Sequence, residues 1–413
     1  MPGFPRVALS MGLARLAQQM VGVAIVLFVL TSYRSAPLAG AVSFLSLMPG
    51  IVVSPIAGAL LDRHGRPRLV MLDYSVACTS LLVIGGLAWF HVLPIWLLLI
   101  ITAISSLTYP LSNTGLRTLF PLLAPRHLWE RANAIDSNAF VIASLLGPPI
   151  AGALVGFLGG PPTLIAIGVL FAIAASVVAD LRDPLPDTST TGRLLLDAWQ
   201  GLLYVIRNPT LRGLAASLST VNFGGGITYI AVPFLLLVHL HQPPAVVGLM
   251  FSLSGLFGLV GTTVAGSLDS RGRERPMLLI PTLVIASALV LVAIVPTLWA
   301  VALAFCLVGI SNGPYDIALF TLRQRRTHPL WMGRAFAVSM ALNFSGVPLG
   351  SAAAGPLLAT FPVWVSLLVA ALVTLTSAGL VFAIPRQAPE PGDSAGLDGH
   401  TRIDQLEEGQ SLG

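Results

Sequence analysis

The chain has 413 residues, of which 55% are hydrophobic and only 9% are charged. An ordinary soluble domain carries about 25% charged residues, so composition excludes both a soluble globule and a disordered chain for the bulk of the protein. All 22 basic residues are Arg, and without Lys the chain cannot form the Lys-containing phosphate loop that many ATP-hydrolysing proteins use. The composition therefore predicts a polytopic membrane protein that is not an ATPase.

Apolar segments long enough to cross a bilayer recur along the whole chain. A span needs about 20 mostly apolar residues, and backbone groups in lipid must bond within their own segment, so each span is expected to be a helix. The predicted fold class is all-α, with twelve transmembrane helices. They cover approximately residues 9–31, 38–60, 69–90, 95–118, 134–158, 162–181, 211–237, 245–268, 277–295, 298–321, 335–359 and 362–384.

The arginines are distributed unevenly between the two ends of these spans. We assign 21 of the 22 Arg to one side or its membrane boundary, and only Arg34 to the other side. The positive-inside rule makes the Arg-rich side cytoplasmic and places both termini there. Because the Arg residues are spread between apolar runs, the net charge of +5 indicates membrane topology rather than binding to nucleic acid.

The longest internal polar stretch divides six spans from six. We predict an N-terminal bundle at 1–181, a cytoplasmic linker at 182–209, a C-terminal bundle at 210–384 and a disordered tail at 385–413. The second half of the linker, RLLLDAWQGLLYVIR, has helical apolar spacing and is expected to lie on the membrane surface.

An internal repeat relates the two halves. The triplet Asp62, Gly65 and Arg66 recurs 207 residues later, and Arg131 recurs as Arg334 after 203 residues. Such near-constant offsets indicate duplicated six-helix halves that run parallel, as in known transporters. The second copy of the triplet is Asp269, Gly272 and Arg273.

The segment GALLDRHGRPR resembles the signature of the loop between helices 2 and 3 in the major facilitator superfamily. The resemblance implies twelve helices in two pseudo-symmetric bundles and a cytoplasmic latch between them. Asp62 is expected to approach Arg334 or the start of the eleventh span, and Asp269 to approach Arg131 or the start of the fifth. The alternative is a solvated loop that only sets topology. The latch candidates are Gly58, Asp62, Arg63, Gly65, Arg66, Arg131, Asp269, Gly272, Arg273 and Arg334.

Two further resemblances point to export. Gly147, Pro148 and Gly152 on the fifth span resemble a motif of antiporters in this superfamily, although ordinary small-residue packing is the alternative. Segments after the fourth span and at the start of the eleventh resemble the drug-exporting branch that includes macrolide-efflux and enterobactin-exporter-like proteins. The matching residues are Arg117, Pro121, Leu128, Ala132, Asn133, Gly333 and Arg334.

Ionisable residues within spans are costly and are functional candidates by default. Asp73 and Asp316 are the first candidates for proton coupling, followed by Asp136 and Arg117, with structural ion pairs as the alternative. The glycines at 224–226 are candidates for a break in the seventh span, with simple flexibility as the alternative. Candidate cavity-lining residues, for which interhelical hydrogen bonding is the alternative, are Gln18, Gln19, Asn113, Asn222, Tyr229 and Asn343.

Together these features predict a secondary active transporter that works by alternating access, uses the proton gradient and exports drugs or other small lipophilic molecules. A proton-coupled importer and a membrane scaffold or sensor are the alternatives. We expect no enzyme activity, cofactor, metal site or disulfide between Cys78 and Cys306. The expected partners are a small-molecule substrate, protons and the bilayer, without ATP or nucleic acid. The chain is expected to act as a monomer in a bacterial cytoplasmic membrane, a location implied by the family resemblance.

Overall fold

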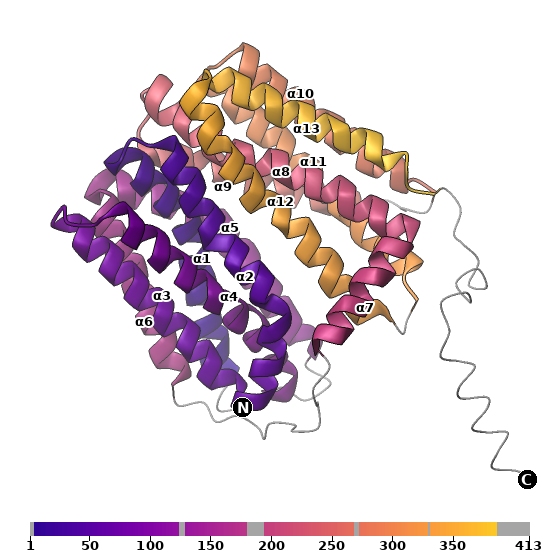
Figure 1. The fold of residues 1–413 in the computed structure, drawn as a ribbon, viewed down its shortest axis with the longest axis horizontal. Helices are drawn as coiled ribbons and strands as arrows, with labels where there is room; N and C mark the ends of the chain where they lie inside the picture. The colour runs from indigo at the N-terminus through magenta and orange to yellow at the C-terminus, as the bar shows by residue number, and fades with distance from the viewer. Residues whose placement is uncertain (1–3, 124–128, 180–193, 268–271, 329–330, 386–413) are drawn as a thin grey trace, which may run out of the picture.

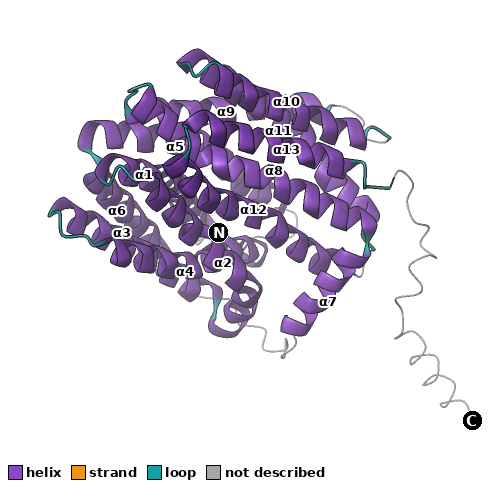
Figure 2. Ribbon diagram, turned by 45° about the horizontal axis from the view of Figure 1, so that its top comes forward, coloured by secondary structure: helices purple, strands orange, loops and turns teal. Residues whose placement is uncertain are grey.

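A computed structural model describes residues 4–123, 129–179, 194–267, 272–328 and 331–385, which are helical throughout apart from short turns (Figures 1 and 2). Twelve of the described helices are long and apolar enough to cross a membrane, which confirms the predicted fold class. The helices of the N-terminal half are α1 (Phe4–Ser32), α2 (Ala36–His64), α3 (Arg66–Trp89), α4 (Ile95–Leu123), α5 (Trp129–Leu158) and α6 (Gly160–Val178).

The second half repeats this arrangement after a short connecting helix, α7 (Leu194–Arg207). Asn208 caps the next helix, since its side-chain oxygen accepts hydrogen bonds from the backbone N–H groups of Thr210 and Leu211. The helices of this half are α8 (Pro209–Phe234), the π-helical turn η2 (Leu235–His239), α9 (Pro244–Gly266), α10 (Glu274–Ile294), α11 (Leu298–Arg326), α12 (Met332–Thr360) and α13 (Val363–Val381).

The backbone conformation explains why the loop signature carries a glycine at the same place in both halves. Gly65 ends α2 and Gly272 precedes α10, and both adopt positive φ values, of 90° and 72°. Only glycine adopts this region without a steric penalty, so both tight turns favour it at the same place in each half. The two Arg residues of the signature, Arg66 and Arg273, then lie at the start of α3 and α10.

The predicted break at glycines 224–226 is wrong. Helix α8 runs continuously from Pro209 to Phe234, and the irregular turn follows Pro233 as η2. Gly224 and Gly226 serve instead as close-packing positions, because a β-carbon at Gly224 would lie 2.9 Å from the Ala370 carbonyl oxygen of α13. Gly226 faces the backbone of α12 in the same way.

The two halves form bundles with matching internal packing. In the first, α1 packs on α5 and α6, α3 packs on α4 and α6, and α2 packs on α4. In the second, α8 packs on α12 and α13, α10 on α11 and α13, and α9 on α11. Figure 1 shows the indigo-to-magenta bundle beside the pink-to-yellow one. The fold is therefore two pseudo-symmetric six-helix bundles.

The bundles contact each other through two equivalent helix pairs, α2 with α12 and α5 with α9. The close glycine contacts of these pairs lie in the half of the molecule away from the Arg-rich loops. There Gly355 of α12 faces Pro37 of α2, and Gly152 of α5 faces Pro244 of α9. The hydroxyl of Ser252 on α9 also donates to the Leu145 carbonyl of α5 at 2.8 Å.

Helix α7 lies at the Arg-rich end, where it contacts both α12 and α2 (Figure 1). The ring of Tyr204 stacks on Trp331 beside the start of α12, with centroids 5.1 Å apart, and the Tyr204 hydroxyl accepts from the His328 backbone N–H. Trp199 is 57% exposed, which agrees with a surface helix. The exact domain boundaries stay predictions, because residues 180–193 and 386–413 lie outside the described part of the chain.

Candidate functional site

A cavity of about 370 Å³ opens between the helices of the N-terminal bundle. Helices α1 to α6 form most of its wall, while the C-terminal bundle contributes Tyr229 from α8 and Val347 and Ser351 from α12. Its wall consists mainly of hydrophobic side chains, together with several serine hydroxyls and two glutamine amides. A largely apolar wall with a few convergent polar groups is typical of a small-molecule site.

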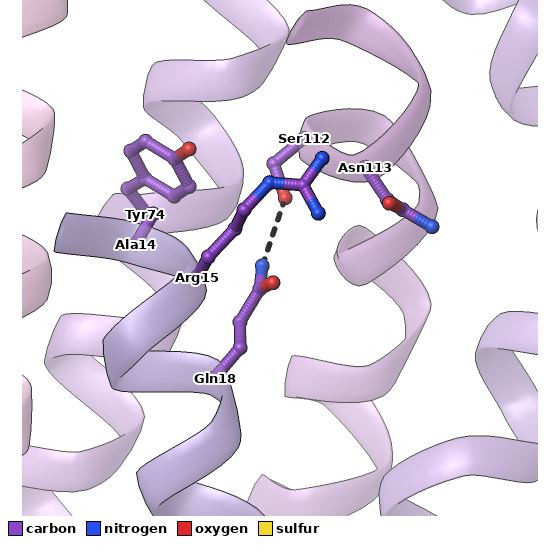
Figure 3. A pocket seen from close by; sticks show the side chains of 6 residues that line it. All are labelled: Ala14, Arg15, Gln18, Tyr74, Ser112 and Asn113. Carbon is purple, nitrogen blue, oxygen red and sulfur yellow. Dashed lines mark hydrogen bonds between the residues drawn. The ribbon is translucent and has the colours of Figure 1, made fainter. Parts of the chain in front are cut away.

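Three of the six predicted cavity residues line this cavity: Gln18, Gln19 and Tyr229. Asn113 lines a smaller adjoining pocket, which shares Arg15 and Gln18 with the main cavity (Figure 3). That pocket has a volume of only about 10 Å³, near the minimum that one water molecule needs.

The other two predicted residues lie where α8 contacts α12. The Asn222 side-chain amide on α8 donates to the Asn343 backbone carbonyl on α12 at 2.8 Å, and Asn343 is fully buried. Neither side chain lines the two pockets described above. The interhelical hydrogen bond that was the alternative interpretation therefore describes Asn222, whereas the side-chain amide of Asn343 is buried without a hydrogen-bond partner.

Tyr229 reaches across the boundary between the bundles. A β-carbon on Gly22 of α1 would lie 2.9 Å from its hydroxyl oxygen, so Gly22 leaves the space that this hydroxyl occupies. The Tyr229 ring packs on Phe251 of α9, which in turn packs edge-on against Phe305 of α11. Tyr229, which lines the cavity, is thus packed on two aromatic rings of the C-terminal bundle that lie behind it.

Asp73 is a buried carboxyl in the cavity wall. Its residue is only 2% exposed, and the Thr108 hydroxyl of α4 donates to its Oδ1 at 2.7 Å. The Ser112 hydroxyl, one turn further along α4, donates to the Tyr109 backbone carbonyl at 3.3 Å and accepts from the Gln18 amide at 3.4 Å. The structure thus places the first coupling candidate at the cavity, where the Thr108 hydroxyl donates to it.

Arg15 is a site residue that the sequence assignment missed. It was counted with the Arg-rich boundary, but it lies inside the span of α1, lines both pockets and is 8% exposed. Its Nη2 forms an ion pair with Oδ1 of Asp136 on α5, and its guanidinium lies 5.4 Å from the Phe140 ring centroid. An Arg within the apolar run of a span, and an acid at the entrance of another, were the signals available in the sequence.

Asp316, the other first candidate for proton coupling, lies away from this cavity. It is on α11 in the C-terminal bundle, with an exposed side chain, and lines neither pocket. The same helix carries a fully buried cation, Arg323, whose guanidinium lies 5.7 Å from the ring centroid of Phe320 and 5.0 Å from that of Phe336. Sequence reasoning treated Arg323 as part of a topogenic cluster, because two further arginines follow it within three residues.

Several latch candidates fall where side chains are not described. These are Gly58, Asp62, Arg63 and Arg131, and Asp269 lies outside the described residues altogether. The side chains of six residues from the drug-exporter resemblance are not described either: Arg117, Pro121, Leu128, Ala132, Asn133 and Gly333. The latch therefore stays a prediction.

Arg334 is the latch candidate whose surroundings are best described. Its Nη1 donates to the Gln200 side-chain oxygen of α7 at 3.2 Å, and its guanidinium lies 5.7 Å from the Trp331 ring. Arg334 therefore contacts the connecting helix in this state of the protein.

The antiporter-like motif lies where three helices meet. Gly147 faces the backbone of Gln19 on α1, while Gly152 faces Pro244 on α9. The motif's Pro148 carbonyl faces Gly248, also on α9. The small residues thus let α5 approach a cavity-lining helix of its own bundle and a helix of the other bundle at once.

Two pseudo-symmetric helical bundles, joined at one end and enclosing a cavity with a buried acid, define the class of two-bundle membrane transporters. The family model described as Major Facilitator Superfamily matches residues 7–351 and 214–407. The chain belongs to this superfamily, and it is a transporter rather than an enzyme.

Similar proteins agree with this assignment. The chain is 35% identical to an uncharacterized MFS-type transporter, y4rN, of Sinorhizobium fredii, over 86% of this chain and 88% of that one. It is 27% identical to the multidrug efflux pump Tap of Mycolicibacterium fortuitum, over 81% and 85%. A crystal structure of the nucleoside transporter NupG has a TM-score of 0.73 at 13% identity, covering 93% of this chain and 99% of that one.

Proposed function

We propose that the protein exports small lipophilic compounds, including drugs, in exchange for protons. The observation that carries this proposal is the position of Asp73, a buried carboxyl in the wall of a mostly apolar cavity. A carboxyl in such a place binds a proton or a cationic ligand, but not both at full strength, which is the requirement for exchange. The resemblance to an efflux pump supports export over import.

The arrangement of the bundles supports loading from the Arg-rich side. The close contacts Gly355–Pro37 and Gly152–Pro244 close the molecule at the opposite end. On the positive-inside rule we propose that the Arg-rich side is cytoplasmic, with both termini there. The family supports a place in the inner membrane. An exporter that takes its substrate from the cytoplasm or the inner leaflet requires this state. Because one chain supplies both bundles and the cavity, we propose a monomer.

Transport then follows alternating access around the cavity. Rocking of the bundles separates the α2–α12 and α5–α9 contacts at the outer end and brings the Arg-rich ends together, where the predicted latch would act. Protonation of Asp73 from the outside displaces the substrate, and release of the proton to the cytoplasm resets the site. Asp316, which lines neither pocket, has no direct part in this exchange.

The test is accumulation of labelled ethidium, a lipophilic cation, in cells that carry or lack the protein, with and without collapse of the proton gradient. We expect lower accumulation with the protein, and loss of the difference when the gradient collapses. Asp73→Asn should behave as the empty control, while Asp316→Asn should retain export. Higher accumulation with the protein would indicate an importer, and no difference for a broad compound panel would favour the scaffold or sensor.

A further inference from the structure

We propose that the part of the cavity farther from the Arg-rich loops is a binding subsite for an uncharged hydrogen-bonding group of the substrate, such as a hydroxyl. Six hydroxyl side chains from three neighbouring helices line the cavity: Ser43 and Ser46 on α2, Ser80 on α3, and Thr102, Ser105 and Ser106 on α4. We call these six residues the hydroxyl cluster. The inference rests on the proposed function, and it narrows the substrate class to lipophilic cations that also carry a neutral polar group.

The hydroxyl cluster lies farther from the Arg-rich loops than the buried acid does. Ser80 follows Asp73 by seven residues on α3, which begins at the Arg-rich end, so the two lie on one face of the helix. At 1.5 Å per residue, their Cα atoms are separated by about 10 Å along the helix axis. Ser43 and Thr102 each lie seven residues after the start of their own helices, α2 and α4, which begin at the opposite end.

Ser43 supplies the observation that points to a ligand. It is only 3% exposed, it lines the cavity, and its hydroxyl oxygen has no hydrogen-bond partner. A serine inside a helix commonly bonds to a carbonyl of its own helix, as Ser46 does to the Ser43 carbonyl at 2.8 Å. A buried hydroxyl without any partner is costly in free energy, so the Ser43 hydroxyl favours a polar group that enters the cavity.

The hydroxyl cluster offers both hydrogen-bond donors and acceptors. Thr102 donates to the Leu98 carbonyl of its own helix at 2.7 Å, which leaves the lone pairs of its oxygen as acceptors. The Ser106 oxygen accepts from the Gly50 backbone N–H at 3.0 Å, which leaves its hydrogen to be donated. A substrate hydroxyl both donates and accepts, so it suits this combination better than an ether or an apolar group does.

The surroundings of the hydroxyl cluster favour an uncharged group. The two charged side chains among the described cavity-lining residues, Arg15 and Asp73, lie nearer the Arg-rich end of their helices. Farther along α1 the lining residues are Val21, Gly22 and Ile25. An ion placed among hydroxyls and hydrocarbon would lose its hydration without a counter-charge, whereas a neutral hydroxyl would be bonded in full. A substrate cation beside Asp73 then lies about 10 Å from the substrate hydroxyl.

The experiment compares the binding of two matched cations to the full chain in lipid nanodiscs, with protein-free nanodiscs to correct for partition into lipid. Benzyldimethyl(7-hydroxyheptyl)ammonium carries a hydroxyl at the end of a chain that, when extended, covers the separation of Asp73 and Ser80. Benzyldimethyloctylammonium has a methyl group in place of that hydroxyl. Because one hydrogen bond changes a dissociation constant by about threefold to tenfold, the native chain should bind the hydroxyl compound more tightly by that factor.

Substitution of Ser43 tests the subsite directly. Ser43→Ala should abolish the preference for the hydroxyl compound and leave the affinity for the octyl compound unchanged. Because the Ser43 hydroxyl has no partner in the free protein, the variant should keep or raise the unfolding temperature, which is measured alongside. Ser176→Ala is the matched control, since Ser176 is exposed on α6, bonds to the Ile173 carbonyl of its own helix and does not line the cavity.

Three results would overturn the subsite. Equal affinity of the native chain for the two compounds would mean that water alone satisfies these hydroxyls. Equal weakening of both compounds by Ser43→Ala would indicate a packing role, and failure of the native chain to bind either compound would remove the basis for the assigned substrate class. Ethidium export by a chain that gives any of these results would leave the proposed function standing, whereas a Ser43-dependent preference in a chain without proton-driven export would contradict only the proposed function.

Discussion

Gly355 of α12 lies so close to Pro37 of α2 that a β-carbon on Gly355 would be 2.7 Å from the Pro37 α-carbon. The pseudo-symmetric contact places a β-carbon on Gly152 at 2.7 Å from the Pro244 carbonyl oxygen. The sequence offsets within these pairs, 203 for the glycines and 207 for the prolines, are those of the internal repeat. Duplication thus produced two copies of one close contact at the end of the molecule opposite the Arg-rich loops.

Replacement of Gly355 by Leu is expected to wedge this outer contact open. No side chain fits against the Pro37 backbone without moving α2, so the population should shift away from the state described here, and transport should fall by roughly tenfold or more. Labelling of a single cysteine placed in the cavity, by a membrane-impermeant reagent added from outside, measures the shift. Gly86→Leu on α3 is the matched control, since no atom lies within 4 Å of a β-carbon there.

Gly22 is expected to set the shape of the cavity through Tyr229. In Gly22→Ala the new methyl group would displace the Tyr229 hydroxyl, because the two would be 2.9 Å apart. We expect reduced export of bulky compounds and a smaller effect on compact ones, measured with a graded substrate panel. Adding Tyr229→Phe should restore export, since it removes the crowded oxygen but keeps the ring that packs on Phe251. Lack of rescue would contradict this contact as the cause.

The cation Arg323 is expected to be dispensable for stability. It is fully buried, two of its nitrogen atoms have no hydrogen-bond partner, and its recorded contacts are two phenyl rings and the Met340 sulfur. Replacing buried charges by apolar groups of similar volume is often neutral or stabilising by about 1–4 kcal/mol. Arg323→Met should therefore keep or raise the unfolding temperature in detergent. A clear fall would indicate that an anionic partner compensates this cation.

The stack of Tyr204 on Trp331 is expected to hold α7 against α12. Aromatic pairs contribute about 0.5–1.5 kcal/mol beyond their buried area, so Tyr204→Ala should loosen the connecting helix without unfolding the bundles. Faster hydrogen exchange at residues 199–207, with unchanged exchange in α8, is the expected result. Tyr204→Phe retains the ring and should exchange like the native chain, which separates the stack from the hydroxyl contact to His328.

The candidate site was only partly predictable from the sequence. Asp73 was identified because an acid inside an apolar span is rare, and Gln18, Gln19 and Tyr229 because polar side chains on spans face other helices or a cavity. Asn222 and Asn343 satisfied the same criterion, but the Asn222 side chain bonds to the backbone of α12 and the Asn343 side chain is buried without a hydrogen-bond partner, and composition alone does not distinguish these roles. Arg15 was missed because a positive charge near the N-terminus was attributed to topology.

What the sequence determined by itself is the arrangement relative to the bilayer: twelve spans, an Arg-rich side and two duplicated halves. Transfer of each segment from water to hydrocarbon depends on the segment's own composition, so this information is local. The tertiary structure decided which side chains meet. Arg15 and Asp136 are 121 residues apart, and their pairing depends on how α1 and α5 are rotated and packed, as does the position of the cavity on the N-terminal side of the molecule.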